Sequence, residues 1–302
     1  MGDVMHSHTY GPYYFWRGLK YRGKLVYTAH VIPETAKGTF PAWKLLMPFF
    51  KWYLKKVYSF ADICIAISPM VEKAIRDLKV KTEIVRIDNP VLLEQWKRSP
   101  DLRSRGREIL GLEQNAFCVL SVGQVQTRKG CEDFIKIGSQ CLNAQFRWVG
   151  GRPFGAFTHG LLRINAAIEN ATPNVKFMGM YSHEDMACIY AAADLFIFPS
   201  FTENCPLAPI EAAASGMPVI FRDIPEYKLL YTNPYLKAAN NTEFLALINE
   251  MMSNSEAYSK GLEISKKLIT QFDKKEIRKK LLDVYKTLAN DELIYELKEI
   301  LK

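Results

Sequence analysis

The chain has 302 residues, of which 48% are hydrophobic and 24% are charged, a composition typical of globular proteins. The length favours two domains, each large enough to bury a core of its own. The sequence has neither a run of about 18 apolar residues nor a signal peptide, so we expect no membrane span and a cytoplasmic location. The six cysteines form no CxxC pair or His/Cys cluster, which argues against a metal site.

The net charge of +8 is unevenly distributed along the chain. Residues 1–105 hold 18 Lys and Arg against 9 Asp and Glu, whereas the remainder holds 22 against 23. A basic half suits an anionic partner, which is either nucleic acid or an anionic membrane surface. No nucleic-acid-binding motif accompanies the charge, so we favour the membrane and expect no nucleic-acid partner. A solvated basic surface without a partner is the alternative.

The first part of the chain contains two short strand patterns and one long helix pattern. Residues 3–8 are predicted to end a strand, and residues 24–30 (KLVYTAH) form a second, which places His30 at the carboxyl end, where open α/β sheets bind ligands. Residues 40–58 repeat apolar side chains at helical spacing between lysines, and Pro48 is expected to kink or divide this helix. Such a helix suits a membrane interface, and it suits equally well packing on the sheet with its lysines extended to solvent.

Two further strands are predicted over residues 61–68 and 82–90, with a helix between them. Residues 97–113 are charged and punctuated by Gly and Pro, so they are predicted to link the domains. We therefore predict a first domain over residues 1–105 and a second over residues 106–302. The second domain opens with a strand, and strands are predicted over three stretches: 117–123, 146–151 and 175–180.

The most informative stretch is residues 199–220 (PSFTENCPLAPIEAAASGMPVI), which follows a buried strand pattern. A helix is predicted to begin near Leu207, and Gly216 lies where a helix commonly ends. Two carboxylates, Glu203 and Glu211, lie eight residues apart around the start of this helix. A helix N-terminus favours phosphate, and carboxylates beside it can hold sugar hydroxyls. The layout suggests a site for a nucleotide sugar.

This stretch resembles the signature of the retaining glycosyltransferases of family 4, because Glu203-x7-Glu211 follows a strand ending in Pro-Ser and precedes Glu-Ala-x-x-x-Gly-x-Pro-Val. The resemblance implies an α/β protein with the GT-B fold, in which two Rossmann-like domains face each other across a cleft and C-terminal helices pack back on the first domain. It implies that Glu203 holds the donor sugar and that Glu211 holds the ribose. The backbone of Asn204, Cys205 and Leu207 is implied to hold the phosphates.

The chain departs from the family pattern directly after Glu203, where the common form has glycines and this sequence has Asn-Cys-Pro. Pro206 has no N–H to donate. Farther upstream, Arg128 and Lys129 precede a glycine, as the phosphate-binding residues of the family do. The resemblance therefore implies that these two cations stabilise the leaving diphosphate. A basic surface turn is the alternative for them.

Two other strand ends match donor-binding positions of the family. Gly123 and Gln124 follow the first strand of the second domain; many relatives have arginine in place of this glutamine, and glycolipid-forming relatives often share it. Three residues lie where the backbone of the family flanks the nucleobase: Met178, Gly179 and Met180.

In the first domain, His30 matches a family histidine near the anomeric carbon of the donor, and it is implied to orient donor or acceptor. A histidine satisfied locally at a strand end is the alternative. Residues 3–8 match a strand that in the family follows earlier strand–helix units. The resemblance therefore implies an incomplete first domain, and a partner chain would cover its open sheet edge.

We predict a retaining, metal-independent glycosyltransferase that moves glucose from UDP-glucose to diacylglycerol or a monoglycosyl lipid at the inner face of the plasma membrane. The nucleotide sugar is a substrate, and no cofactor is expected, because nothing resembles the metal-binding DxD pair of the other major glycosyltransferase fold. A cell-wall or capsular acceptor is the alternative among enzymes. A non-catalytic nucleotide-binding subunit of a full-length enzyme, or a peripheral membrane scaffold, are alternatives of other classes.

Overall fold

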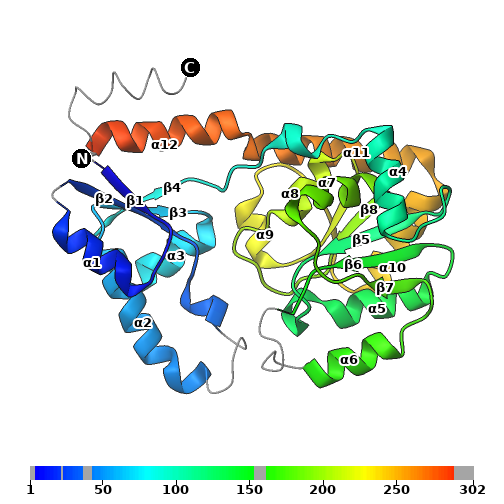
Figure 1. Ribbon diagram of the computed structural model, residues 1–302, viewed down its shortest axis with the longest axis horizontal. Coiled ribbons are helices and arrows are strands. Elements are labelled where there is room, and N and C mark those ends of the chain that lie inside the picture. Colours follow the sequence, from blue (N-terminus) through cyan, green and yellow to red (C-terminus); the bar gives the residue numbers. More distant parts are fainter. Residues whose placement is uncertain (1–3, 22, 37–42, 153–160, 289–302) are drawn as a thin grey trace. The chain divides into compact units, whose positions relative to one another are not determined.

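The computed structural model describes residues 4–21, 23–36, 43–152 and 161–288 (Figure 1). It divides into two compact units: unit 1 comprises Met1–Pro90 and Lys274–Lys302, and unit 2 comprises Val91–Asp273. The division after Pro90 differs from the expected one after residue 105, which lies inside a helix of unit 2. Within the described ranges, every helix is too short or too polar to cross a lipid bilayer.

Unit 1 is built on a four-stranded parallel sheet in the order β1-β2-β3-β4. Its strands are β1 (Val4–Ser7), β2 (Lys24–Ala29), β3 (Ile63–Ala66) and β4 (Glu83–Arg86). Its helices are α1 (Pro12–Lys20), α2 (Trp43–Ser59), α3 (Pro69–Asp77) and α12 (Lys274–Leu288), with a short 3-10 helix, η1 (Pro33–Ala36).

Both faces of this sheet are covered, as the apolar character of its strands requires. On one face, Tyr27 of β2 packs against Tyr14 of α1 and Tyr58 of α2, with ring centroids 5.2 Å and 5.6 Å apart. The next residue back along the strand, Val26, points to the opposite face and packs with Ile277 of α12. The last described helix of the chain therefore completes the core of the first unit.

Helix α2 runs without interruption from Trp43 to Ser59, with Pro48 inside it. Pro48 was expected to kink or divide this helix, and the helix is not divided. Proline removes one backbone hydrogen bond, and the exposed position of Pro48 leaves the carbonyl that loses its partner near water. The carboxyl-terminal half of α2 buries Leu54 and Val57, and this half anchors the helix in unit 1.

Unit 2 contains a six-stranded parallel sheet in the order β10-β9-β8-β5-β6-β7. Its strands are β5 (Cys118–Val122), β6 (Gln145–Val149), β7 (Val175–Phe177), β8 (Leu195–Phe198), β9 (Val219–Arg222) and β10 (Leu236–Ala238). Counted from β5, this is the doubly wound order 3-2-1-4-5-6 read in reverse. The chain therefore winds in opposite directions from the two central strands, β5 and β8.

Helices cover both faces of this second sheet, and two apolar clusters, one on each side, form its core. The helices are α4 (Pro100–Ile109), α5 (Cys131–Gln140), α6 (Leu161–Glu169), α7 (His183–Ala192), α8 (Ala208–Ala214), α9 (Pro225–Leu230), α10 (Asn241–Ser253) and α11 (Ser255–Ile269). Three short 3-10 helices, η2 (Leu93–Trp96), η3 (Thr127–Lys129) and η5 (Thr270–Phe272), join them.

The expected linker over residues 97–113 is instead the packed helix α4. Ser99 caps its start by accepting a hydrogen bond from the Leu102 N–H at 3.2 Å, and Pro100 occupies the first turn. A Cβ at Gly106 would lie 1.9 Å from the Cys188 carbonyl oxygen, so the glycine permits close contact with α7. In this stretch the proline lies in the first turn of a helix and the glycine allows contact with another helix. Composition alone does not distinguish such a helix from a loop.

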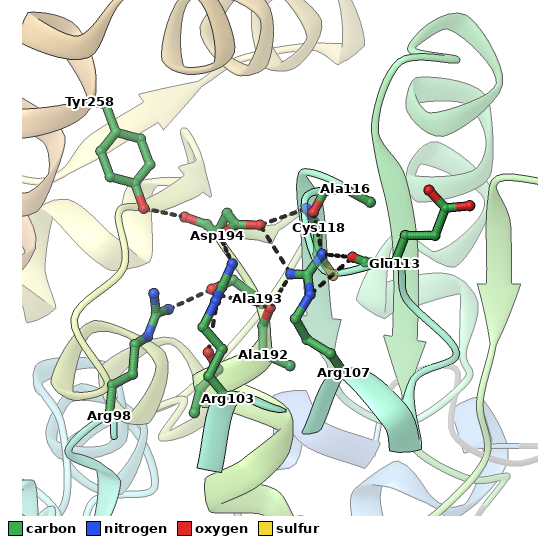
Figure 2. Close-up of polar contacts among 11 residues, drawn as sticks. Arg98, Arg103, Arg107, Glu113, Ala116, Cys118, Ala192, Ala193, Asp194 and Tyr258 are labelled. Carbon is green, nitrogen blue, oxygen red and sulfur yellow. Dashed lines mark hydrogen bonds and ion pairs between the residues drawn. The ribbon is translucent and has the colours of Figure 1, made fainter. Parts of the chain in front are cut away.

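The arginines of this stretch form a network around Asp194, at the start of β8 (Figure 2). Arg103 donates to the Asp194 carboxylate at 2.8 Å, and the fully buried side chain of Arg107 lies 3.7 Å from it. The Arg107 guanidinium also donates to three backbone carbonyls, those of Glu113, Ala116 and Ala192. These contacts join α4 to α7 and to the start of the central strands.

Candidate active site

The candidate site of unit 2 lies at the carboxyl ends of β5 and β8. The chain turns in opposite directions after these two strands, and in open α/β sheets ligands bind outside the carboxyl ends of the strands at such a point. The loop after β5 contains η3 with Arg128 and Lys129, and the loop after β8 contains Glu203. Sheet topology therefore brings together the predicted cations and the predicted sugar-binding carboxylate, although 74 residues separate Lys129 from Glu203.

Lys129 and Glu203 form a buried ion pair, in which the ammonium donates to carboxylate oxygen Oε1. Their side chains are 13% and 8% exposed, so water screens this pair weakly. The Ser200 hydroxyl donates to the same oxygen at 2.6 Å. Burial lowers the pKa of Lys129 and the nearby Arg128 lowers it further, whereas Glu203 opposes both effects by stabilising the ammonium.

The two loops are fastened to each other beside this pair. Gly130 has φ of +77°, and a Cβ there would lie 2.3 Å from the Pro199 carbonyl oxygen. The Phe201 N–H donates to the Arg128 carbonyl at 2.8 Å. Glycine is therefore required where the two loops meet, and the contact fixes the backbone of both Arg128 and the Glu203 loop.

The second predicted carboxylate, Glu211, lies in helix α8, which begins at Ala208 as expected near Leu207. Gly216 follows the helix with φ of +84°, which confirms its predicted role at the helix end. The Tyr190 hydroxyl donates to Glu211 Oε2 at 2.8 Å. Burial raises the pKa of Glu211, and the bond from Tyr190 opposes that rise.

The remaining predicted residues of unit 2 lie at neighbouring strand ends. The Gly123 N–H, after β5, donates to the Val149 carbonyl at 2.9 Å. The Met178 N–H, after β7, donates to the Trp148 carbonyl at 2.8 Å, and Gly179 has φ of +78°. The side chains of Gln124 and Met180 are exposed. Those of Asn204, Cys205 and Leu207 are half-buried in the loop before α8.

His30 belongs to unit 1, where it follows β2 as predicted and joins a cluster of three imidazoles. His8 Nδ1 lies 3.0 Å from His30 Nε2, and the rings of His6 and His8 stack with centroids 4.5 Å apart. His6 uses both ring nitrogens, on the Tyr285 hydroxyl at 2.6 Å and the Thr28 hydroxyl at 2.7 Å. The local hydrogen bond of His30 agrees with its alternative, purely structural interpretation.

A cavity of about 390 Å³ opens beside this cluster, between the sheet of unit 1 and α12. Its walls are mainly apolar and include Ile65, Ile87 and Ile277. His6 and His8 contribute polar atoms to its lining, together with six other polar side chains: Thr28, Asp88, Asn89, Lys274, Arg278 and Tyr285. The volume and the apolar walls with a few polar groups are those of a small-molecule pocket.

The imidazole cluster is expected to make the protein less stable in mild acid. Burial and the other two histidines lower the pKa of His6 from 6.5 to about 4, and burial lowers the pKa of His8 and His30. The folded state thus binds fewer of these protons than the unfolded state, so this stability is present above pH 6.5 and is lost as pH falls toward 4. Between pH 7.5 and 5 we expect His6 to contribute a loss of roughly 1 kcal/mol, allowing for its partial exposure.

Urea unfolding of the chain and of His6→Asn at these two pH values measures this effect. The variant is expected to lose less stability on acidification than the unmodified chain. An equal loss in both proteins would contradict the assignment to His6.

Two residues of this region were missed from the sequence. Ser200, which bonds Glu203, directly follows the β8 strand pattern, and its place next to the glutamate loop was a usable signal. Tyr190 lies 21 residues before Glu211 on another helix, and no local pattern connects them. Only the packing of α7 beside α8 brings this phenol to the carboxylate.

Family models match both halves of the chain. The model described as Glycosyltransferase Family 4 matches residues 3–95, and the model described as Glycosyl transferases group 1 matches residues 116–254. The alpha-galactosylglucosyldiacylglycerol synthase of Streptococcus pneumoniae is 32% identical over 296 residues, which cover 95% of this chain and 78% of that protein. The processive diacylglycerol alpha-glucosyltransferase of Acholeplasma laidlawii is 29% identical over 242 residues, 78% of this chain and 72% of that protein.

Solved structures of other proteins share this fold. Sucrose-phosphate synthase from Thermosynechococcus elongatus superimposes with a TM-score of 0.77 at 21% identity, over 95% of this chain and 73% of that chain. Anabaena HepE in complex with UDP-glucose gives 0.76 at 20% identity, over 95% and 79%. Family models match both halves of the chain, the synthase of Streptococcus pneumoniae is similar over 95% of it, and both of its sheets are parallel. The chain therefore belongs to glycosyltransferase family 4, has the GT-B fold and is an enzyme.

Proposed function

We propose that this glycosyltransferase moves glucose from UDP-glucose to a membrane lipid such as diacylglycerol, with retention of the anomeric configuration. The observation that carries the proposal is the buried Lys129–Glu203 pair at the divergence of β5 and β8, with Glu211 eight residues farther along the chain. The names of the two curated relatives, both of which describe synthesis of diacylglycerol glycolipids, support the lipid acceptor. UDP-glucose in the HepE structure supports the donor.

In this proposal Glu203 accepts hydrogen bonds from hydroxyls of the donor hexose, and Glu211 accepts those of the ribose. Lys129 and Arg128 hold the diphosphate and stabilise the charge that develops on it as the glycosidic bond breaks. Helix α8 has only seven residues, so its own dipole adds little and the two side-chain cations carry most of this task. The reaction then needs no metal ion.

The rest of the donor would lie along the neighbouring strand ends. Backbone N–H groups of Asn204, Cys205 and Leu207 would bind phosphate oxygens, and Pro206 would interrupt that row of donors. Gly123 and Gln124 would flank the diphosphate after β5. The nucleobase would contact the backbone at Met178, Gly179 and Met180, where the positive φ of Gly179 opens the turn.

For the acceptor we propose the cavity of unit 1 beside His8 and His30. Its apolar walls suit the hydrocarbon of a lipid, and the imidazoles at its edge suit an acceptor hydroxyl. Burial lowers the pKa of His30, which favours the neutral imidazole, a form that can take part in a hydrogen bond with a hydroxyl. His30 would thereby orient the attacking hydroxyl.

We propose that α1 and α2 bind an anionic membrane, which makes the enzyme peripheral on the cytoplasmic face. Helix α2 exposes Leu45, Phe49 and Trp52 by 80%, 65% and 55%, and α1 exposes Trp16 and Leu19. Exposed lysines lie among these side chains: Lys20, Lys44, Lys51, Lys55 and Lys56. Exposed aromatic and aliphatic side chains among lysines suit an interface with anionic lipid.

The variant Leu45→Ser/Phe49→Ser is expected to bind anionic liposomes at least about tenfold more weakly, because it removes two large apolar side chains from the interface. Sedimentation with phosphatidylglycerol vesicles measures the binding. Leu162→Ser is the matched control, since Leu162 is 87% exposed on α6 of unit 2. Equal binding by the double variant and the control would exclude this face.

The open edge of β1 is a further place for a partner. In the described part of unit 1, β1 pairs only with β2, and its other edge is the end of the sheet. We propose that a partner chain covers this edge, because an unpaired strand edge offers backbone groups for pairing. Light scattering of the purified chain at several concentrations measures self-association. A dimer would make a second copy the partner, whereas a monomer at all concentrations would exclude self-association as the cover of this edge.

The experiment that tests the function is release of UDP from UDP-glucose by the purified chain, with and without liposomes that contain diacylglycerol. Lipid-dependent release together with a labelled glycolipid is the expected result. Release that depends on added polysaccharide acceptors and not on lipid would favour the cell-wall or capsular alternative. The anomeric configuration of the product, read by NMR, tests retention.

A further inference from the structure

The Tyr190 hydroxyl contacts one of the two carboxylates of the candidate site. It donates to Glu211 Oε2 at 2.8 Å, from helix α7 to helix α8. Both helices cover the same face of the unit 2 sheet, where Tyr190, Ile210 and Ala212 share one apolar cluster. The bond therefore joins two elements whose apolar side chains belong to the same cluster.

The Tyr190 ring is held firmly enough to direct its hydroxyl. The side chain is fully buried, Trp96 meets it edge-to-face with centroids 5.3 Å apart, and Phe196 lies at 6.3 Å. Trp96 is itself buried and packs edge-on against His183. The two side-chain torsions of this tyrosine are both restrained by packing. The hydroxyl therefore has a fixed position, and the carboxylate that accepts its hydrogen bond is held relative to it.

A carboxylate that accepts one hydrogen bond keeps further acceptor positions, because its two oxygens have about four lone-pair sites. The Tyr190 bond therefore does not block Glu211. It favours the rotation of the carboxylate plane that keeps Oε2 on the phenol, and Oε1 is the second acceptor oxygen of the group. A planar, oriented acceptor suits a pair of adjacent hydroxyls better than a freely rotating one does, because less side-chain freedom is lost on binding.

We propose that Tyr190 is a positioning residue for the nucleotide: it holds Glu211 in the orientation that binds the ribose hydroxyls of the donor. The inference rests on the proposed role of Glu211. Tyr190 itself does not contact the ligand in this proposal.

The same bond also affects the charge of Glu211. Burial raises the pKa of this carboxyl group, and donation from Tyr190 lowers it again because the hydrogen bond favours the charged form. The nearby His183 of α7 also lowers this pKa and is the same in the unmodified chain and in the variant tested below. Loss of the phenol hydroxyl is therefore expected to raise the pKa of Glu211. Nucleotide binding that needs the carboxylate should then begin to fail at a higher pH.

Calorimetric titration of Tyr190→Phe with UDP and with 2′,3′-dideoxy-UDP tests the proposal. The variant keeps the ring and its packing and loses only the hydroxyl. We expect UDP to bind roughly 3- to 10-fold more weakly than to the unmodified chain, the range of one lost hydrogen bond to a charged group acting through orientation. The dideoxy nucleotide, which has no ribose hydroxyls, should bind both proteins equally.

Tyr258→Phe is the matched control, because Tyr258 also donates from a half-buried phenol, to the Asp194 carbonyl at 2.9 Å, away from the site (Figure 2). It should bind UDP like the unmodified chain. If Tyr190→Phe weakens UDP and the dideoxy nucleotide to the same extent, or weakens neither, the positioning role is overturned.

Glu211→Gln separates this inference from the function on which it rests. If Glu211→Gln weakens UDP and Tyr190→Phe does not, only the role of Tyr190 is lost. If Glu211→Gln binds UDP normally, the ribose contact itself is wrong. A pH series completes the test: the UDP affinity of Tyr190→Phe should decline at higher pH than that of the unmodified chain as the solution is acidified, and superimposed profiles contradict the proposal.

Discussion

Replacing Glu203 by alanine is expected to reduce glycosyl transfer by roughly 10²- to 10³-fold, the effect of removing one oriented hydrogen-bonding group from a transition state. UDP alone should still bind within about threefold of the unmodified affinity. The reason is that Glu203 is proposed to contact the hexose, which UDP lacks. Turnover of UDP-glucose and calorimetric binding of UDP, measured on the same preparation, separate the two quantities.

Lys129→Met, unlike Glu203→Ala, should weaken the binding of UDP. It removes the buried cation that is proposed to hold the diphosphate, so UDP itself should bind at least about tenfold more weakly. Glu250→Ala, an exposed glutamate on α10 of the same unit, is the control for both and should change neither quantity. If Glu203→Ala transfers at the normal rate, the assignment of this site is wrong.

Replacing Arg107 by methionine is expected to lower the free energy of unfolding by roughly 3–5 kcal/mol. The change leaves three backbone carbonyls without their charged donor and removes one of the cations near Asp194. Methionine fills part of the space, so lost polar contacts and not a cavity should dominate. Urea unfolding of the full chain, followed by circular dichroism, measures the loss.

Arg105→Met is the matched comparison for this change, because Arg105 lies on the same helix, is 66% exposed and pairs with Asp185 at 3.2 Å on the surface. An exposed pair of this kind is worth at most about 1 kcal/mol. If the two variants lose similar free energies of unfolding, the buried contacts of Arg107 stabilise the protein no more than the exposed pair of Arg105 does.

The parts of the fold that were predictable from the sequence are those with a local signal. The β8 strand, the start of α8 near Leu207 and the glycine at its end follow from an apolar run, a proline and a glycine within a few residues. The two glutamates and Arg128-Lys129 were found because a family pattern fixes their local neighbours. All of these predictions depend on fewer than about 20 consecutive residues.

What could not be predicted depends on contacts between distant segments. The pairing of Lys129 with Glu203 requires β5 and β8 to be neighbours, which strand order decides and periodicity does not. Residues 97–113 resembled a linker because their arginines suggested a solvated surface, yet Arg107 is buried on backbone carbonyls. The bond from Tyr190 to Glu211 likewise depends on which helix packs beside α8.

The two units differ in chain continuity, and therefore in when their parts are synthesised. Unit 2 is one continuous segment, Val91–Asp273, whereas the core of unit 1 includes Ile277 and Val284 from α12. At 5–20 residues per second, synthesis of unit 2 separates the sheet of unit 1 from that helix by roughly ten to forty seconds. For this interval one apolar face of the sheet has no cover from its own chain. Unit 2 can therefore complete its fold during synthesis, whereas unit 1 must wait for α12. A chaperone that binds exposed apolar surface would hold unit 1 until that helix has been made.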